Sequence, residues 1–161
     1  MVWKSKPQPT KQKPRVTILI GILGRHGIVL ASDSQTSFEA SKRRDTEKIR
    51  VVRFKDKSAL VSAAGSSDVA DQVIDTLCRY AEAEKLDDEA KVASIMQRAM
   101  MYVREGLRSH HGGCSAEELR NILIQDGIEC DFMMAFHCKG SPRLYCLKLQ
   151  NGTLEIGQIN L

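Results

Sequence analysis

Apolar runs of strand length alternate with short polar breaks over the first 65 residues. Residues 16–33 read VTILIGIL, GRHG and IVLASD, two β-branched apolar runs around a turn-like tetrapeptide, and they predict a tight hairpin. Residues 34–47 are polar and charged and are expected to form a loop. KIRVVRF and SALVSAA then flank KDK over residues 48–64, which predicts a second hairpin.

The spacing of apolar residues changes after the Gly65-Ser66-Ser67-Asp68 break. Apolar side chains recur every three or four positions over residues 69–81 and again over residues 92–107, after the start signal Asp87-Asp88. These periods predict two amphipathic helices. Ser115 with Glu118 matches a capping box and predicts a shorter third helix over residues 115–126, ending near Gly127.

Three further strand-like runs, CDFMMAFHC, RLYCLKL and TLEIGQI, close the chain and are separated by KGSP and QNG. Consecutive hairpins imply antiparallel sheets. Seven strands with two faces each imply an α+β sandwich of two stacked sheets flanked by helices. The chain ends at Leu161 on a strand, so we expect the second helical layer to be missing and one outer face to be covered by further residues or by a partner.

Composition favours one soluble domain. The chain has 161 residues, 42% of them hydrophobic and 5% aromatic, which suits an aliphatic core. It has no apolar run of membrane-spanning length and no secretory h-region, so we expect a cytoplasmic protein without a membrane partner. The five cysteines include no CxxC pair and are interpreted as reduced thiols, mostly in the core.

The positive charge lies in the N-terminal tail. The net charge is +4, and five positive residues precede residue 17 without any acid: Lys4, Lys6, Lys11, Lys13 and Arg15. A basic folded face for specific nucleic-acid binding is therefore not indicated, although the tail could touch phosphates non-specifically. We interpret residues 1–16 as a basic extension or propeptide rich in Lys, Pro and Gln, and residues 17–161 as one incomplete domain.

Two short patterns resemble ligand sites but lack the required context. HHGGC at residues 110–114 offers three ligands on a glycine-rich turn without a fourth partner, so we interpret it as a polar loop and expect no metal. Gly21, Gly24 and Gly27 resemble a dinucleotide fingerprint, but a strand follows where that fingerprint requires a helix. No cofactor is expected.

The chemistry-bearing residues fall at strand ends. Thr17 opens the first predicted strand, Asp33 ends the second, Lys48 starts the third and Gly65 ends the fourth, with Gly27 in the first turn. This constellation resembles the proteasome β-subunit and bacterial HslV peptidase family of N-terminal-nucleophile (Ntn) hydrolases. The 16-residue step from Thr17 to Asp33 agrees with the family. The 15-residue step to Lys48 is one residue short, which the intervening loop can absorb.

The resemblance implies a threonine-type endopeptidase with the Ntn-hydrolase αββα fold. Its nucleophile would be the hydroxyl of Thr17, activated by the residue's own α-amino group once the preceding peptide is cut. Lys48 would lower the cost of forming the alkoxide, and Asp33 would hold the lysine ammonium. The backbone N–H of Gly65 would face the oxyanion.

The same resemblance supplies substrate-binding positions and partners. Ser37 would offer main-chain hydrogen bonds to an extended peptide, and Ala63 with Ser67 would line a roomy pocket for the residue before the cut. A homo-oligomeric ring, a peptide or protein substrate and a possible ATPase unfoldase partner are also implied.

Two departures keep a second interpretation open. Val16 stands where self-processing precursors have glycine, and a β-branched residue resists the twist that self-cleavage needs. The family's later serine and aspartate positions lie beyond Leu161. The alternative is therefore a non-catalytic ring subunit that resembles proteasome α-subunits and keeps its N-terminal extension. The Asp33–Lys48 pair counts against it, since a structural subunit has no chemical need for both.

Overall fold

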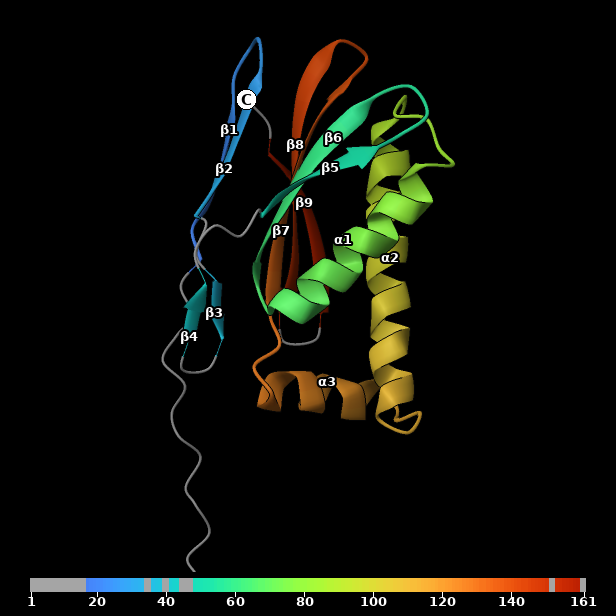
Figure 1. Ribbon diagram of the computed structural model, residues 1–161. Helices are drawn as coiled ribbons and strands as arrows, with labels where there is room; N and C mark the ends of the chain where they lie inside the picture. Colours follow the sequence, from blue (N-terminus) through green and yellow to red (C-terminus); the bar gives the residue numbers. More distant parts are fainter. Residues whose placement is uncertain (1–16, 34–35, 39–40, 44–47, 151–152, 160–161) are drawn as a thin grey trace, which may run out of the picture.

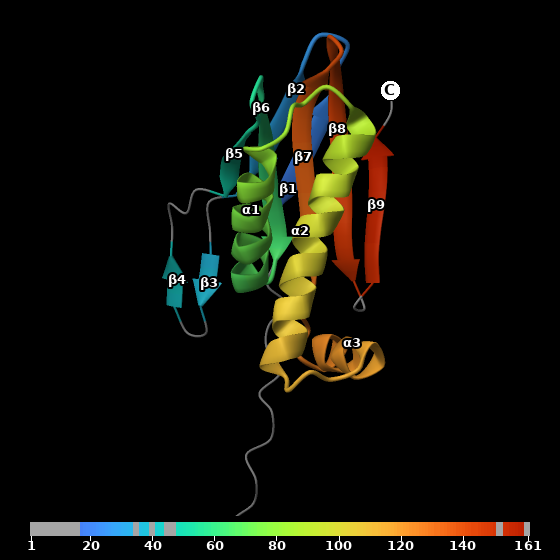
Figure 2. The same cartoon turned by 90° about the vertical axis from the view of Figure 1, so that its right-hand side faces the viewer.

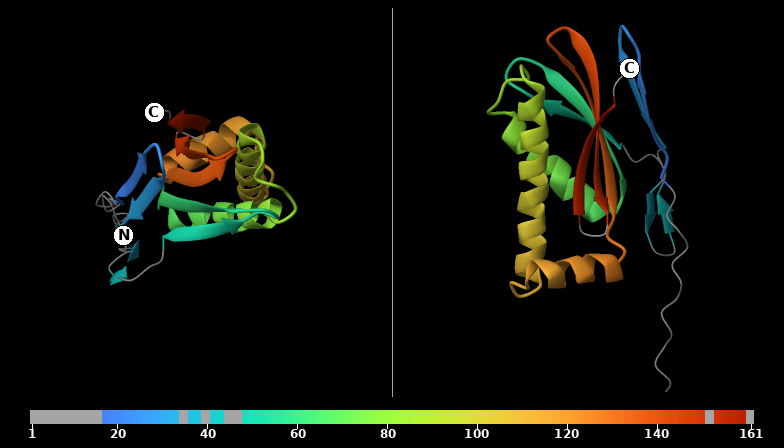
Figure 3. Two further views of the ribbon diagram at one scale, coloured as in Figure 1. Left: turned by 90° about the horizontal axis from the view of Figure 1, so that it is seen from above. Right: turned by 180° about the vertical axis from the view of Figure 1, so that it is seen from behind.

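The computed structural model describes residues 17–33, 36–38, 41–43, 48–150 and 153–159. A β-hairpin, a five-stranded sheet and a pair of helices form three successive layers (Figures 1 and 3). The elements are β1 (Leu19–Leu23), β2 (Ile28–Ser32), β3 (Thr36–Phe38), β4 (Ser41–Arg43), β5 (Ile49–Arg53), β6 (Ser58–Gly65), α1 (Ser67–Ala81), α2 (Glu89–His110), α3 (Ala116–Gln125), β7 (Cys130–Cys138), β8 (Ser141–Gln150) and β9 (Thr153–Ile159). The predicted α+β arrangement of two stacked antiparallel sheets with helices is confirmed.

The first hairpin forms where the sequence predicts it. β1 pairs antiparallel with β2, and Gly24 N donates to Gly27 O at 2.9 Å to close the turn. Gly21 lies on the face that packs on the five-stranded sheet. A Cβ placed there would lie 2.7 Å from Leu144 Cδ2 and 3.1 Å from Met133 Sδ. The absent side chain therefore lets the two sheets approach closely.

The expectation of a loop over residues 34–47 is wrong for part of that segment. β3 and β4 form a short antiparallel hairpin in which Ser37 pairs with Lys42. Strands of three residues, with Phe38 as their one apolar residue, are too short to show hydrophobic alternation, so the pattern could not reveal them. The described residues accordingly form nine strands instead of the seven predicted.

The five-stranded sheet carries the core. Its order is β5-β6-β7-β8-β9, antiparallel throughout. α1 and α2 cover the face opposite the hairpin (Figure 2), and side chains such as Val61, Phe136 and Ile95 are buried between sheet and helices. The predicted KGSP turn is shorter than expected, because Pro142 pairs with His137 inside the β7–β8 ladder.

Both predicted start signals begin helices. The Asp88 side chain accepts a hydrogen bond from Ala90 N at 3.1 Å and caps α2. Ser115 Oγ accepts from Glu118 N at 3.2 Å while Ser115 N donates to Glu118 Oε2 at 2.7 Å, so the capping box of α3 is confirmed. The hydrogen bond from the Ser115 backbone N–H to the carboxylate, and to a smaller extent the Ser115 hydroxyl, hold the pKa of Glu118 below its ordinary value.

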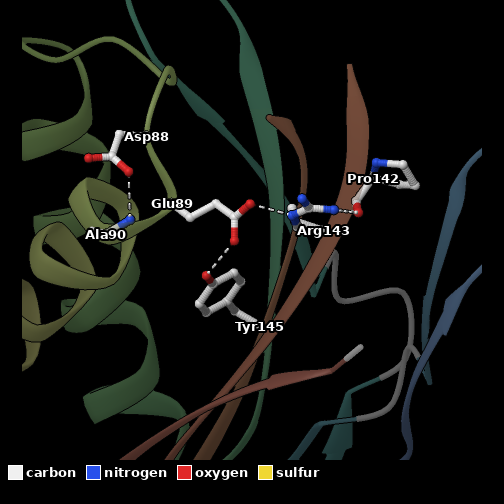
Figure 4. A network of polar contacts seen from close by, with 6 residues as sticks. All are labelled: Asp88, Glu89, Ala90, Pro142, Arg143 and Tyr145. Atoms are coloured by element: carbon white, nitrogen blue, oxygen red, sulfur yellow. Dashed lines mark hydrogen bonds and ion pairs between the residues drawn. The ribbon is translucent and has the colours of Figure 1, made fainter. Parts of the chain in front are cut away.

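A polar network ties the start of α2 to the sheet (Figure 4). The Glu89 carboxylate accepts from Arg143 Nε at 2.5 Å and from the Tyr145 hydroxyl at 3.2 Å. The Tyr145 ring also stacks on Phe136, with centroids 5.5 Å apart. Arg143 and Tyr145 both belong to β8, so the network fixes where α2 begins on the sheet.

The outer face of the β1–β2 hairpin is apolar and exposed. Four β-branched side chains on it are 47–58% exposed: Ile18, Ile20, Ile22 and Val29. Figure 3 shows this hairpin on the opposite side of the sheet from α1 and α2. Within the described residues no helix covers it.

Candidate functional site

An ion pair joins the two strand-end residues that the sequence singles out. Lys48 Nζ lies 2.9 Å from Asp33 Oδ1. The lysine side chain is only 12% exposed and that of Asp33 26% exposed. Asp33 directly follows β2 and Lys48 directly precedes β5, so the pair connects the hairpin with the edge of the five-stranded sheet. Partial burial makes such a contact stronger than a surface pair.

Thr17 lies next to this pair along the backbone. Ile18 N donates to Asp33 Oδ1 at 3.3 Å, and Asp33 N donates to Ile18 O at 3.1 Å. The same carboxylate oxygen therefore contacts the lysine ammonium and the peptide N–H that joins Thr17 to Ile18. Thr17 itself is half-buried and precedes β1 by two residues.

Strand register brings the remaining candidates toward Lys48. Ile49 pairs with Ser62 in the β5–β6 ladder. Continuing that register by one residue places Ala63 opposite Lys48, with Gly65 two residues further along β6. Ala63 is half-buried and packs against the core beneath the helices.

Gly65 has a strict steric requirement of its own. Its φ is +110°, and a Cβ there would lie 2.0 Å from Glu129 O. Gly65 pairs with Cys130, and Ser66 N donates to Glu129 O at 2.9 Å. Only glycine satisfies both the backbone conformation and the approach of β7.

For the other predicted substrate-binding residues, Ser67 and Ser37, the structure records no contact with the Asp33–Lys48 pair among the described residues. Ser67 is the first residue of α1, and its Oγ donates to Asp68 Oδ1 at 3.4 Å. The backbone of Ser37 lies in β3, while its side chain lies outside what the structure describes. Sequence reasoning missed Ser62, whose fully buried Oγ has no hydrogen-bond partner among the described residues. A serine in an apolar strand carries no distinguishing signal.

Cys130 offers no rival nucleophile in this region. Its Sγ donates to Ser66 O at 3.4 Å, and burial raises the pKa of the thiol to about 12. The thiol is therefore protonated at neutral pH and weakly nucleophilic. All five cysteines lie in the described residues, where none forms a disulfide; Cys130 and Cys138 are buried and the other three half-buried.

The described ranges hold neither a cluster of metal-ligating side chains nor a membrane-spanning helix. Among those residues no group of three or more His, Cys, Asp and Glu side chains could hold a metal ion. None of the described helices is long and apolar enough to cross a membrane.

Structural neighbours share the fold of this chain. The Anbu protein of the Pseudomonas aeruginosa helical assembly superposes with a TM-score of 0.64 at 17% identity, over 90% of this chain and 57% of the Anbu chain. Anbu (ancestral β-subunit) from Yersinia bercovieri gives 0.58 at 14% identity, over 90% and 56%. A Gly-1 mutant of Anbu from Hyphomicrobium sp. strain MC1 gives 0.55 at 18%, over 89% and 60%.

These comparisons define the family but leave the whole protein's activity open. The chain spans a little more than half the length of the Anbu chains that it matches. No curated protein matches its sequence. The family model "Proteasome subunit" matches residues 15–114, more than half of the chain. That match includes Thr17, Asp33, Lys48 and Gly65, and the chain therefore belongs to the proteasome-subunit family.

Proposed function

We propose that this protein is a threonine peptidase that hydrolyses peptide bonds with Thr17 as an N-terminal nucleophile. One observation carries the proposal: the half-buried Asp33–Lys48 pair, whose carboxylate also binds the peptide N–H that follows Thr17. Removing a lysine ammonium from water is costly without a partner. A subunit with only a structural role has no chemical reason to hold this pair beside a threonine.

The proposed mechanism requires a cut between Val16 and Thr17. The freed α-amine of Thr17 would accept the hydroxyl proton as Oγ attacks the substrate carbonyl. The Lys48 ammonium would stabilise the developing charge, and Asp33 would hold that ammonium in place through a charge-assisted hydrogen bond. The backbone N–H of Gly65 would donate to the oxyanion. The peptide C–N bond would then break as the Thr17 α-ammonium returns its proton to the leaving amine, and water would hydrolyse the resulting acyl ester on Thr17.

Substrate would lie along the exposed edges near this site. We propose that the β3 backbone at Ser37 pairs with an extended peptide, and that Ala63 and Ser67 line the pocket for the residue before the cut. Ala63 lies opposite Lys48 by register, and this position suits a wall of such a pocket. Its small side chain leaves room for a large substrate residue.

N-terminal sequencing and intact mass of the native protein test the proposal. We expect residues 1–16 to be absent and an epoxyketone peptide, which reacts with a hydroxyl and an α-amine on one residue, to label Thr17. Thr17→Ala should abolish labelling and peptidase activity, whereas Thr17→Ser should retain both. Lys48→Met should lower kcat by about 10²-fold or more. Peptidase activity with residues 1–16 still attached would refute the proposal.

The alternative is a non-catalytic subunit that keeps its N-terminal extension. Val16 favours it, because a β-branched residue resists the conformation that self-cleavage requires. This alternative predicts an intact residue 1 and no labelling by the epoxyketone. The same two measurements therefore separate enzyme from scaffold.

We further propose that the protein assembles into homo-oligomers, in a ring or a helix. The related Pseudomonas aeruginosa protein is described as a helical assembly, and heterologous interfaces repeat into a closed ring or an open helix. The ATPase unfoldase partner and cytoplasmic location remain predictions from the sequence. Stimulation of protein degradation by ATP in a native extract would test the first, and cell fractionation the second.

A further inference from the structure

Ser62 carries a buried hydroxyl whose hydrogen bond the described residues do not supply. The side chain is 0% exposed, and its Oγ has no hydrogen-bond partner among those residues. Thr76 is the other polar residue in the described core, and its Oγ1 accepts a hydrogen bond from Arg79 Nη2 at 3.0 Å. Burying a hydroxyl without a partner destabilises a fold. A serine at a position where alanine would pack equally well therefore calls for an explanation.

Strand alternation places Ser62 on the face of the five-stranded sheet that packs against the β1–β2 hairpin. Its neighbour Val61 is buried in the core beneath the helices, and successive residues of a strand point to opposite faces. Ser62 pairs with Met133 on β7, and paired residues share a face. Met133 Sδ lies 3.1 Å from the position that a Cβ of Gly21 would take on β1. Ser62 Oγ therefore lies between the hairpin and the sheet, two layers that Figure 3 shows side by side.

Ser32 of the hairpin points into the same layer. It pairs with Leu19 and is half-buried, whereas Ala31 beside it is exposed. Leu19 shares the inner face of β1 with Gly21, two residues away. Ser32 Oγ donates a hydrogen bond to the main-chain O of Asp33 at 3.2 Å. A hydroxyl that donates one hydrogen bond can also accept one, so Ser32 Oγ can receive a further bond from within the layer.

Contacts on either side of Ser62 indicate which part of the hairpin lies over it. On β7, the partner of Ser62 approaches Gly21. On β5, the partner of Ser62 directly follows Lys48, whose ammonium is 2.9 Å from the Asp33 carboxylate. Between Gly21 and Asp33 the hairpin holds the pair that contains Ser32. The register therefore brings Ser32 over Ser62, at the strand ends where the ion pair joins the two sheets.

The space between two facing serines matches the size of one water molecule. Stacked sheets lie about 10 Å apart, and two short serine side chains leave about 5 Å between their oxygens, close to two O–H···O bonds of about 2.8 Å each. A leucine or isoleucine at either position would fill that space. A buried water needs at least two polar partners. The two hydroxyls supply them, because Ser62 Oγ can donate and Ser32 Oγ can accept.

We propose that Ser62 Oγ and Ser32 Oγ bind one buried water molecule, and that this bridge holds the Asp33 end of β2 against β5. The hydrogen bonds run from Ser62 through the water to Ser32 and on to the main-chain O of Asp33, and each bond in such a chain polarises the next. Asp33 in turn bonds Lys48. Ser62 is thus a positioning residue that acts through Asp33 and not on the substrate. In that role the inference rests on the proposed peptidase function, whereas the bridge itself does not.

A double-mutant cycle in urea denaturation of the full chain tests the bridge. Ser62→Ala should lower the urea midpoint by about 0.5 M, and Ser32→Ala by at least as much. The double variant should lose no more than Ser32→Ala alone, because both changes remove the same bridge. Ser58→Ala is the matched control, since Ser58 is an exposed serine on the same strand and should leave the midpoint unchanged. A midpoint that rises in Ser62→Ala, as expected for a dry hydroxyl, or losses that add would overturn the proposal.

Amide hydrogen exchange measures how firmly Asp33 is held, without any need for activity. The Asp33 N–H, which donates to Ile18 O at 3.1 Å, should exchange about fivefold faster in Ser62→Ala. The Ser66 N–H, bonded to Glu129 O beyond the end of β6, should keep its exchange rate. A crystal structure of the full chain should show the water in the wild type and not in Ser62→Ala. Equal acceleration of both amides, or no water between the two serines of the wild type, would contradict the bridge.

Peptidase kinetics test the positioning role. Ser62→Ala should lower kcat by about tenfold or more and leave KM unchanged, because Asp33 and Lys48 would be misplaced while the substrate-binding surfaces stay intact. Ser58→Ala should change neither constant. An unchanged kcat in Ser62→Ala would refute the positioning role. A wild type without peptidase activity would instead refute the proposed function, and the denaturation cycle and amide exchange would still decide whether the bridge exists.

Discussion

Replacing Gly65 with alanine should severely destabilise the protein, because two independent constraints act at this residue. Its φ of +110° lies outside the region open to other residues, which costs about 1–3 kcal/mol. A Cβ would also lie 2.0 Å from Glu129 O, and relieving that overlap must move the β7 backbone. The hydrogen bond from Ser66 N to Glu129 O would then weaken, at about 1 kcal/mol. We expect a total loss of about 4 kcal/mol.

Urea denaturation followed by far-UV circular dichroism measures this loss. With an m-value of about 2 kcal/mol/M, the midpoint should fall by about 2 M. Two other glycines serve as controls. Gly21→Ala meets only the flexible ends of Leu144 and Met133 and should cost about 1–3 kcal/mol. Gly106→Ala meets open space and should stabilise α2 by about 1 kcal/mol. A loss below about 1 kcal/mol for Gly65→Ala would contradict the positive φ of Gly65 and the close approach of Glu129 O.

Three further predictions concern the core and the exposed hairpin face. Burial raises the pKa of the Cys130 thiol to about 12. The stabilisation from burying the neutral thiol is therefore complete below pH 9, and the free energy of unfolding should fall by about 1 kcal/mol by pH 10, where the thiol ionises only in the unfolded chain. This part of the pH slope in urea titrations should vanish in Cys130→Ala. Tyr145→Phe keeps the stacking on Phe136 but loses the bond to Glu89, so the free energy of unfolding should fall by about 1 kcal/mol, and no change would contradict the network. Ile20→Lys should reduce the binding of a hydrophobic dye while changing stability by less than about 0.5 kcal/mol, since Ile20 is 47% exposed; unaltered dye binding would show that the face is covered.

Elements with strong periodicity were predictable from the sequence. Hydrophobic spacing and cap chemistry act over a few residues. They were enough to predict the β1–β2 hairpin, both long helices and the capping box at Ser115. The β3–β4 hairpin was not predictable, because strands of three residues are too short to show a hydrophobic period. The layer order depends on contacts between distant residues, such as Gly21 against Leu144, which no local pattern encodes.

Only the proximity of two candidate residues was predictable from the sequence. A family pattern identified Asp33 and Lys48, and the structure brings their charged groups to 2.9 Å. The hydrogen bond from Ile18 N was not foreseeable, because it depends on how β1 enters the sheet beside the end of β2.

The candidate residues do not support the peptidase proposal equally. Gly65 has a complete structural explanation in its φ and in the approach of Glu129 O, so a glycine there would be required in a non-catalytic subunit as well. The ion pair of Lys48 and Asp33 has no such explanation, because an apolar pair of similar size could fill a half-buried position between two sheets without desolvating two charges. The effect of Lys48→Met therefore separates the two functions. In an enzyme it should remove activity and leave assembly intact, whereas in a scaffold any effect should appear in stability alone.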